Sequence, residues 1–256
     1  MDPAPSIGIF GALVVLVVSM VMEGGSPASL LLPAPILLVV GVTVLVTIAG
    51  GTMADAKQSI AGLKHAFTSK APSVDDLIDP IVALAEKVRR EGMLAVEDQV
   101  ASLDDPFLQK GLTMAIDGVD IEEVREVLEA ELRAKRADDR QTAKFFSDAG
   151  GYAPTIGIIG TVMGLVHVLG NLSSPDKLGP LIASAFVATL WGVMSANLVW
   201  FPLANRIKRI GQIEATRMEL AIEGVFSIQA GVSPRLMGDK LRSLLPANQH
   251  GAAEAA

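Results

Sequence analysis

The 256-residue sequence contains no cysteine, one tyrosine and two tryptophans, and only 19% of its residues are charged. The absence of cysteine excludes disulfide frameworks, thiolate metal sites and cysteine nucleophiles. Charge is also unevenly distributed, because residues 3–54 hold only Glu23. Residues 149–205 hold only Asp176 and Lys177. A typical soluble domain carries roughly 25% charge, so this pattern excludes an ordinary soluble enzyme and a disordered chain.

The sequence also contains fewer basic residues than acidic residues, 21 against 28. The formal net charge is −7, which argues against nucleic acid as a partner. The sequence shows no nucleophile–base pair, no glycine-rich phosphate loop followed by lysine, and no metal-ligand cluster. We therefore expect neither an enzyme nor a protein with a bound cofactor.

The sequence is rich in apolar residues, which make up 50% of it and gather in long runs. A bilayer core of roughly 30 Å needs about 20 apolar residues in a helix. Four runs reach about this length, at residues 3–22, 30–49, 149–172 and 178–204. They predict an all-α membrane protein with four transmembrane helices and a helical cytoplasmic domain between the second and the third.

Lysine and arginine predict the orientation. Of the 21 in the chain, 13 lie between the second and third runs and seven follow the fourth, whereas the two short connecting loops hold only Lys177. The positive-inside rule then places the long segment, the tail and both termini in the cytoplasm. The N-terminus lacks a basic region, so no cleaved signal peptide is expected. The predicted division is transmembrane helices 1 and 2 in residues 1–52, a cytoplasmic helical domain in 53–147, transmembrane helices 3 and 4 in 148–204, and cytoplasmic C-terminal helices and tail in 205–256.

The segment between the second and third spans is acidic and helical by pattern. A helix is predicted from Ser73 towards Glu91, with a break or kink at Pro80. Asp105 before a proline predicts a capped helix start, and Asp120 predicts the start of a long helix towards Phe146. Residues 87–98 hold dense charges of both signs and are interpreted as a charged turn between two helices.

The predicted spans lack the ionisable groups that ion paths usually contain. The second and fourth hold no Asp, Glu, Lys, Arg or His, the third holds only His167 near its outer end, and Glu23 lies at the outer end of the first. If ions cross the membrane here, the essential carboxylate must come from another chain. His167 either takes part in proton movement or bonds to a carbonyl or interfacial water.

Small residues and hydroxyls mark the third and fourth spans. The third carries Gly157, Gly160 and Gly164 at helical spacing, and the fourth carries a similar stripe. Such stripes allow close helix packing. Thr155 and Thr161 on the third span and Thr189 on the fourth add oxygen atoms that could line an ion pathway.

Two prolines lie at similar positions in these spans. Pro154 and Pro202 both fall near the predicted cytoplasmic ends. A proline frees the carbonyl one turn earlier and permits bending. The pair therefore suits a gate or lever that couples conformations, although a single proline of this kind more often produces a simple kink.

Four groups of residues resemble flagellar motor stator proteins of the MotA/PomA type. Residues 151–165 (GYAPTIGIIGTVMGL) resemble the third span of that family, and residues 188–205, with ATLWGV, Asn197 and FPLAN, resemble the fourth. Residues 89–97, with RREG and AVE, resemble the family's cytoplasmic charged motif, and Pro234-Arg235 resembles its C-terminal segment. The match follows the order of nearly the whole chain.

This resemblance implies a bacterial inner-membrane subunit that forms a ring, a pentamer, around two copies of a MotB/PomB-type partner with one membrane helix. The partner supplies an ion-carrying aspartate, and ion passage drives rotation through contact with a rotor switch-complex protein. By resemblance, the rotor contact maps to Arg89 and Glu97 with Arg90 and Asp98 as neighbours. Coupling maps to the two prolines, and the ion path to Thr161 and Thr189.

The resemblance leaves both H⁺ and Na⁺ open as the transported ion, because Thr161 is similar to sodium-type members and His167 to proton-type members. A TolQ/ExbB-like energiser of envelope processes is the nearest alternative. Those proteins typically have three spans, so four spans and the charged motif argue against it. A non-conducting helical membrane scaffold is a further alternative, which the threonines and paired prolines disfavour.

Overall fold

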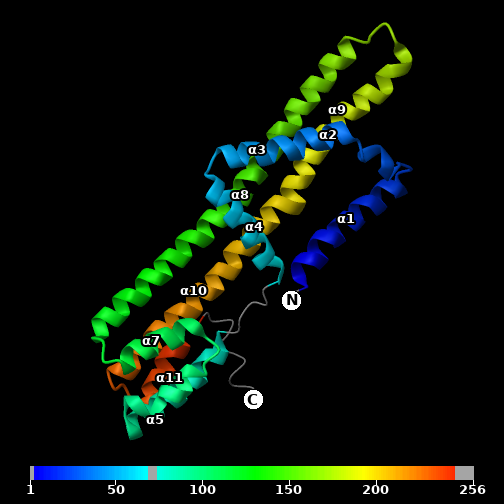
Figure 1. Ribbon diagram of the computed structural model, residues 1–256. Coiled ribbons are helices and arrows are strands. Elements are labelled where there is room, and N and C mark those ends of the chain that lie inside the picture. Colours follow the sequence, from blue (N-terminus) through cyan, green and yellow to red (C-terminus); the bar gives the residue numbers. More distant parts are fainter. Residues whose placement is uncertain (1–2, 69–73, 246–256) are drawn as a thin grey trace. The chain divides into compact units, whose positions relative to one another are not determined.

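The computed structural model describes residues 3–68 and 74–245, and within them every regular element is helical (Figure 1). The prediction of an all-α protein is confirmed for these residues. The chain divides into two compact units. Unit 1 contains Met1–Lys70 and Asp139–Arg209, and unit 2 contains Ala71–Asp138 and Ile210–Ala256.

Unit 1 contains the apolar helices. They are α1 (Ala4–Met22), α2 (Pro33–Ile36), α3 (Val42–Ala49), the second part of α8 (Ile121–Leu169), α9 (Pro175–Ser195) and the start of α10 (Phe201–Gln229). By length and composition, α1, α8 and the continuous run Pro175–Gln229 can each cross a membrane, while Pro33–Ala49 is a shorter apolar helix. Four spans therefore remain a prediction. The second apolar helix is short because Pro27–Leu30 forms a separate 3₁₀ turn, η1, before it.

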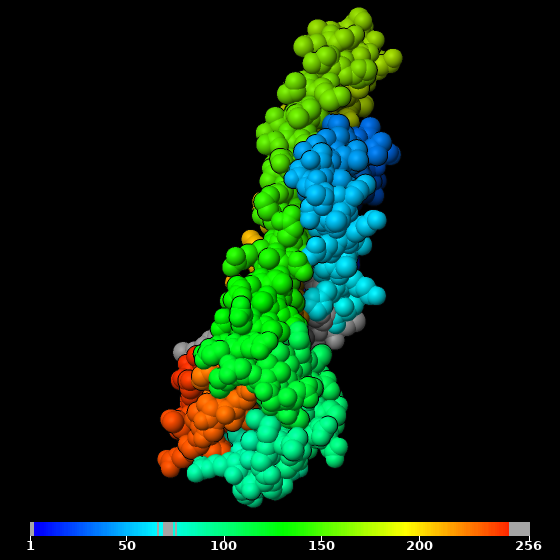
Figure 2. Space-filling model, turned by 60° about the vertical axis from the view of Figure 1, so that its left-hand side comes forward, coloured from blue at the N-terminus to red at the C-terminus, as the bar shows by residue number. Residues whose placement is uncertain are grey.

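Two π-helical segments interrupt the apolar helices of unit 1. The first, η2 (Leu37–Gly41), joins α2 to α3, and the second, η5 (Ala196–Trp200), joins α9 to α10. The segment joining α8 to α9 extends past α2 and α3 in both views of the molecule (Figures 1 and 2). A buried cluster of Ala143, Phe146, Leu203, Ala204 and Ile207 holds α8 against α10.

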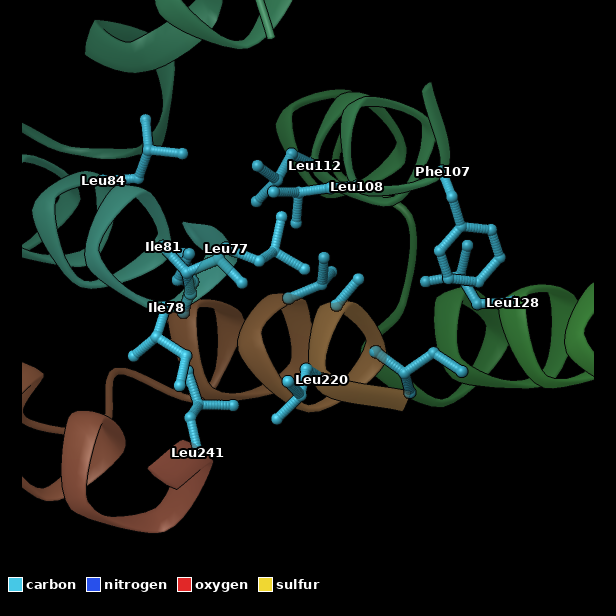
Figure 3. Packing of buried hydrophobic residues seen from close by; sticks show 14 of the residues in the cluster. Leu77, Ile78, Ile81, Leu84, Phe107, Leu108, Leu112, Leu128, Leu220 and Leu241 are labelled. Carbon is cyan, nitrogen blue, oxygen red and sulfur yellow. The ribbon is translucent and has the colours of Figure 1, made fainter. Parts of the chain in front are cut away.

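Unit 2 has its own apolar core, drawn in Figure 3. Its helices are α5 (Ile78–Glu91), α6 (Glu97–Ala101), α7 (Pro106–Ile116), the first part of α8, the second part of α10, and α11 (Pro234–Ser243). Ile81, Leu108, Leu128, Leu220 and Leu241 come from five of these helices and are all almost fully buried. Each helix therefore contributes one apolar face to a single core.

Two helix starts in unit 2 follow the sequence prediction. The Asp105 carboxylate accepts hydrogen bonds from the backbone N–H groups of Phe107 (3.1 Å) and Leu108 (3.0 Å), and it also pairs with Arg217 at 2.7 Å. Asp120 accepts from the N–H of Glu122 at 2.9 Å. Side-chain acceptors at these positions satisfy donors that the first helical turn leaves free.

Two local predictions need correction, and a third cannot be compared with the structure. Pro80 does not break α5, because it is the third residue of that helix, where no intrahelical N–H bond is required. The helix predicted to end near Phe146 continues through the third apolar run as the 49-residue α8. The predicted start of the first helix in unit 2, at Ser73, lies outside the described residues.

Candidate functional site

Thr161 and Thr189 meet between α8 and α9. Their hydroxyl groups hydrogen-bond to each other. The Thr161 Oγ1 also lies 3.0 Å from the carbonyl oxygen of Ala185 and 3.2 Å from that of Gly157, and both threonines are partly buried. Two hydroxyls and two carbonyls thus form a cluster of hard oxygen atoms of the kind that can coordinate a cation or bond to water.

The glycine and alanine stripes permit this contact. A Cβ on Gly157 would lie 2.9 Å from the Ala188 carbonyl oxygen, and one on Gly192 would lie 2.6 Å from the Ala153 carbonyl oxygen. A Cβ on Gly164 would lie 2.9 Å from the Cα of Ala185. The two backbones are therefore in contact along three helical turns, which is why side chains as short as threonine reach the opposite helix.

Thr155 does not join the pair. Its side chain is exposed, and its hydroxyl donates to the carbonyl oxygen of Tyr152 on its own helix at 2.8 Å. Thr155 and Thr161 are six residues apart on α8, which places them on different faces of a helix with 3.6 residues per turn. The structure thus brings together two of the three predicted hydroxyls.

The segments around the two predicted prolines are in contact. Pro154 lies inside α8 and cannot donate to the carbonyl of Gly150, four residues earlier. A Cβ on Gly150 would lie 2.7 Å from the ring of Phe201, the residue directly before Pro202. The turn that Pro154 weakens therefore packs against the start of α10.

Sequence reasoning missed the π-helical segment η5, which ends two residues before Pro202. A wider helical turn accommodates a proline that cannot hydrogen-bond to the preceding turn. The side-chain amide of Asn197 donates to the carbonyl of Val193 at 2.9 Å and satisfies one backbone group at the start of the segment. In the sequence, Pro202 indicates that the helix is irregular near this position, but it does not indicate that the irregularity is a π-helical segment.

A tertiary hydrogen bond fixes the start of the second apolar helix. The indole N–H of Trp191 on α9 donates to the carbonyl of Leu30 in η1 at 2.7 Å. A buried tryptophan usually finds a hydrogen-bond acceptor for its indole N–H. The sequence therefore indicates that Trp191 has an acceptor, but it does not identify Leu30 as that acceptor.

His167 and Glu23 lie at helix ends. His167 is exposed in the last turn of α8, where the side-chain amide of Asn171 donates to its carbonyl at 2.8 Å. Glu23 is exposed directly after α1. Both lie where the sequence predicts the outer ends of spans.

The charged turn is the second candidate site. Gly92 ends α5 with φ +90°, a conformation that favours glycine, and η4 (Met93–Val96) leads into α6. The four predicted contact residues, Arg89, Arg90, Glu97 and Asp98, are all exposed. Within the described residues, no ion pair involves any of these four side chains.

Two apolar residues of this turn were missed by the sequence analysis. Val96 is fully buried in the core of unit 2 and fixes the turn in place, whereas Leu94 is 73% exposed. Leu94 lies between the arginines and the acids in the chain, so the turn presents an apolar side chain flanked by both charge signs. Because the turn is short and irregular, no repeating pattern in the sequence shows which of its apolar residues is buried and which is exposed.

Two ionisable groups near the ends of the apolar segments have shifted pKa values. Asp55 in α4 (Met53–Thr68) accepts from the backbone N–H and the hydroxyl of Thr52, both at 2.8 Å, and these bonds lower the pKa of the carboxyl. The hydrogen bond with the Asp148 carboxylate, and then the charge of that group, raise the pKa of Lys144. Both groups are held in their charged forms.

Comparison with known proteins gives matches along almost the whole chain. The model of the Motility protein A N-terminal family matches residues 6–92, and that of the MotA/TolQ/ExbB proton channel family matches residues 99–220. Motility protein A of Bacillus subtilis is 37% identical over 96% of this chain and 92% of its own length. Chemotaxis protein PomA of Vibrio alginolyticus is 34% identical over 96% of each.

Solved structures show the same architecture. The flagellar MotAB stator complex from Bacillus subtilis superposes with a TM-score of 0.87 at 37% identity, covering 94% of this chain and 96% of that chain. The structure of C. jejuni MotAB gives a TM-score of 0.92 at 25% identity, covering 97% and 98%. The likeness therefore covers nearly all of both units.

Proposed function

The chain belongs to the MotA/TolQ/ExbB proton channel family, and on that basis we propose that it is a stator subunit of the flagellar motor that couples ion flow to rotation. The observation that carries this conclusion is the match over 96% of the chain to a motility protein A. A match of residues 6–92 to the N-terminal model of motility protein A favours a stator over an envelope energiser of the same family.

We further propose that unit 1 crosses the inner membrane four times. Three helices have the length and composition of spans, and Pro33–Ala49 is a shorter apolar helix without a charged residue. The distribution of lysine and arginine supports cytoplasmic termini and a cytoplasmic unit 2. The short second helix would cross with the help of η1, which Trp191 holds against α9.

The partner in this proposal is a MotB/PomB-type subunit with one membrane helix bearing an aspartate. The solved relatives are MotAB complexes. In this chain, residues 149–169 and 178–205 hold no carboxylate, so the group that binds and releases the ion must be supplied from outside. A ring of five copies around the partner is the assembly that we propose.

The ion path in this proposal passes the oxygen cluster of Thr161 and Thr189. A sodium ion would use the hydroxyls and carbonyls as ligands. A proton would instead reach the partner's carboxylate through water and would need no such ligand. In the structure the two hydroxyls bond to each other, so a bound cation would replace that bond.

In this proposal, a conformational change in unit 1 would pass through the contact near the two prolines and would act on the rotor through the charged turn. The packing of Gly150 on Phe201 places the turns around Pro154 and Pro202 in one contact, so a change at one proline affects the other. The charged turn with Arg89, Arg90, Glu97 and Asp98 would contact the rotor switch-complex protein, because its exposed charges are available to a partner.

Complementation tests the proposed function. The chain is expressed with its MotB/PomB-type partner in a bacterium that lacks its own stator, and swimming is measured in soft agar. We expect swimming to be restored. Failure of swimming, together with rescue of a strain that lacks its TolQ/ExbB-type proteins, would assign the chain to envelope energisation instead.

A further inference from the structure

An apolar cavity of about 350 Å³ lies in unit 1 between α1 and the helical run that passes through η5 into α10. On one side, Ala4, Gly8 and Ala12 line it, and on the other, Leu198, Pro202 and Arg206 do. Both sets recur every four residues, so each forms one stripe about 12 Å long on its helix. The cavity is therefore a groove that runs along the helix axes.

The groove has one charged end. Ala4 is the first residue of α1, and Arg206 follows the fourth apolar run, so these two residues lie at the same predicted end of the membrane-spanning segments. Arg209 follows Arg206 by three residues on the same side of the helix and is exposed. From this end to Ala12 and Leu198, the lining is apolar except for Asn197, whose side-chain amide donates to the carbonyl of Val193.

We propose that this groove binds an anionic phospholipid of the cytoplasmic leaflet. Its phosphate lies against the guanidinium groups of Arg206 and Arg209, and one acyl chain fills the space between Gly8 and Pro202. A positive group at the interface attracts acidic headgroups, and apolar walls at membrane depth accept a hydrocarbon chain. The proposal rests on the proposed topology, in which unit 1 spans the bilayer and the end of the groove with Arg206 faces the cytoplasm.

Gly8 gives the groove its width. A Cβ on Gly8 would meet no atom within 4 Å, so this stretch of α1 stands clear of the opposite wall. No residue of α1 is buried in the described structure. An acyl chain in the groove would supply packing for α1 that the chain itself does not provide.

Variants at two glycines of α1 separate this groove from the rest of the helix. Gly8→Leu fills the groove with a side chain, whereas Gly11→Leu adds the same side chain to the same helix at a position that also has open space but does not line the groove. Both replace glycine by a better helix former, so neither is expected to unfold α1.

The measurement is native mass spectrometry of the complex with its partner subunit, incubated in detergent with equal amounts of phosphatidylglycerol and phosphatidylethanolamine. We expect the wild type and Gly11→Leu to retain phosphatidylglycerol preferentially, and Gly8→Leu to lose it. Arg206→Gln should reduce the preference about fivefold, the loss of roughly one cationic contact.

Three outcomes would overturn the proposal. Equal retention of phosphatidylglycerol by Gly8→Leu and the wild type would show that lipid binds elsewhere. An unchanged headgroup preference in Arg206→Gln combined with Arg209→Gln would remove the phosphate contact. If the wild type binds no lipid and Gly8→Leu changes the number of copies of the chain in the complex, the groove would be a contact with a neighbouring copy.

Discussion

The hydroxyl of Thr161 on α8 hydrogen-bonds to the hydroxyl of Thr189 on α9. Both groups also approach the carbonyl of Gly157, at 3.2 Å from Thr161 and 3.4 Å from Thr189. The pair joins two helices, and in the proposed function it has a second role, in which its oxygen atoms lie beside the partner's membrane helix. Only the second role depends on the ion.

Substitution of Thr161 tests these roles. Thr161→Val keeps the shape and removes the hydroxyl, which should lower the free energy of unfolding by about 1 kcal/mol through the lost hydrogen bonds. If sodium is carried, half-maximal swimming speed should also need more sodium. Thr155→Val is the matched control, because that hydroxyl bonds only to its own helix turn.

The outcome distinguishes the two ions. A sodium requirement that rises in Thr161→Val but not in Thr155→Val supports a sodium ligand. Swimming that is indifferent to sodium in the wild type and stops with a protonophore excludes sodium and leaves the Thr161–Thr189 pair with a packing role.

Gly192 should be intolerant of any side chain. In Gly192→Ala the new Cβ would lie 2.6 Å from the Ala153 carbonyl oxygen, so α8 and α9 must separate, at a cost of about 1–3 kcal/mol. Gly179→Ala on the same helix α9 meets no atom within 4 Å and should be neutral or stabilising. Thermal unfolding of the two variants should differ clearly, and equal melting temperatures would contradict the close contact.

Charge reversal in the charged turn should impair swimming without affecting folding. Arg89→Glu and Glu97→Lys change exposed side chains, and an exposed charge contributes at most about 1 kcal/mol to stability even when it is paired. Torque measured on tethered cells should fall, while protein level and melting temperature stay unchanged. Arg133→Glu, which reverses an exposed charge on α8, should keep normal torque. Loss of protein in both turn variants would indicate a structural role instead.

Asp55 should make the free energy of unfolding depend on pH in acid. Its pKa is lowered by bonds from Thr52, so the ionised carboxylate stabilises the folded state. This stabilisation is complete above the carboxyl's unfolded pKa and is lost as pH falls through its lower folded pKa. The difference in unfolding free energy between the wild type and Asp55→Asn should therefore be constant near neutral pH and shrink in acid. A difference that does not change with pH would contradict stabilisation of the ionised Asp55 carboxylate by Thr52.

The sequence predicted the features that depend on local pattern. Helical periodicity and side-chain acceptors located the helix starts at Asp105 and Asp120, and small residues at helical spacing identified the faces on which Gly157 and Gly192 meet. These signals are carried by neighbouring residues, so they can be interpreted without tertiary structure.

Features that depend on distant segments were not predictable. The contact of Gly150 with Phe201 joins α8 to the start of α10, and the bond from Trp191 to Leu30 joins residues 161 positions apart. The prediction at Pro80 was wrong because the helix starts only two residues earlier, a boundary that sequence patterns locate poorly.

Ion flux into vesicles tests the central claim, that this chain contributes a path but not the ion-binding carboxylate. Flux is measured for the chain alone, for the chain with its MotB/PomB-type partner, and for the same complex in which the partner's membrane aspartate is replaced by asparagine. We predict flux only with the unaltered partner. Proton or sodium flux through the chain alone, or flux that survives the replacement, would contradict the account.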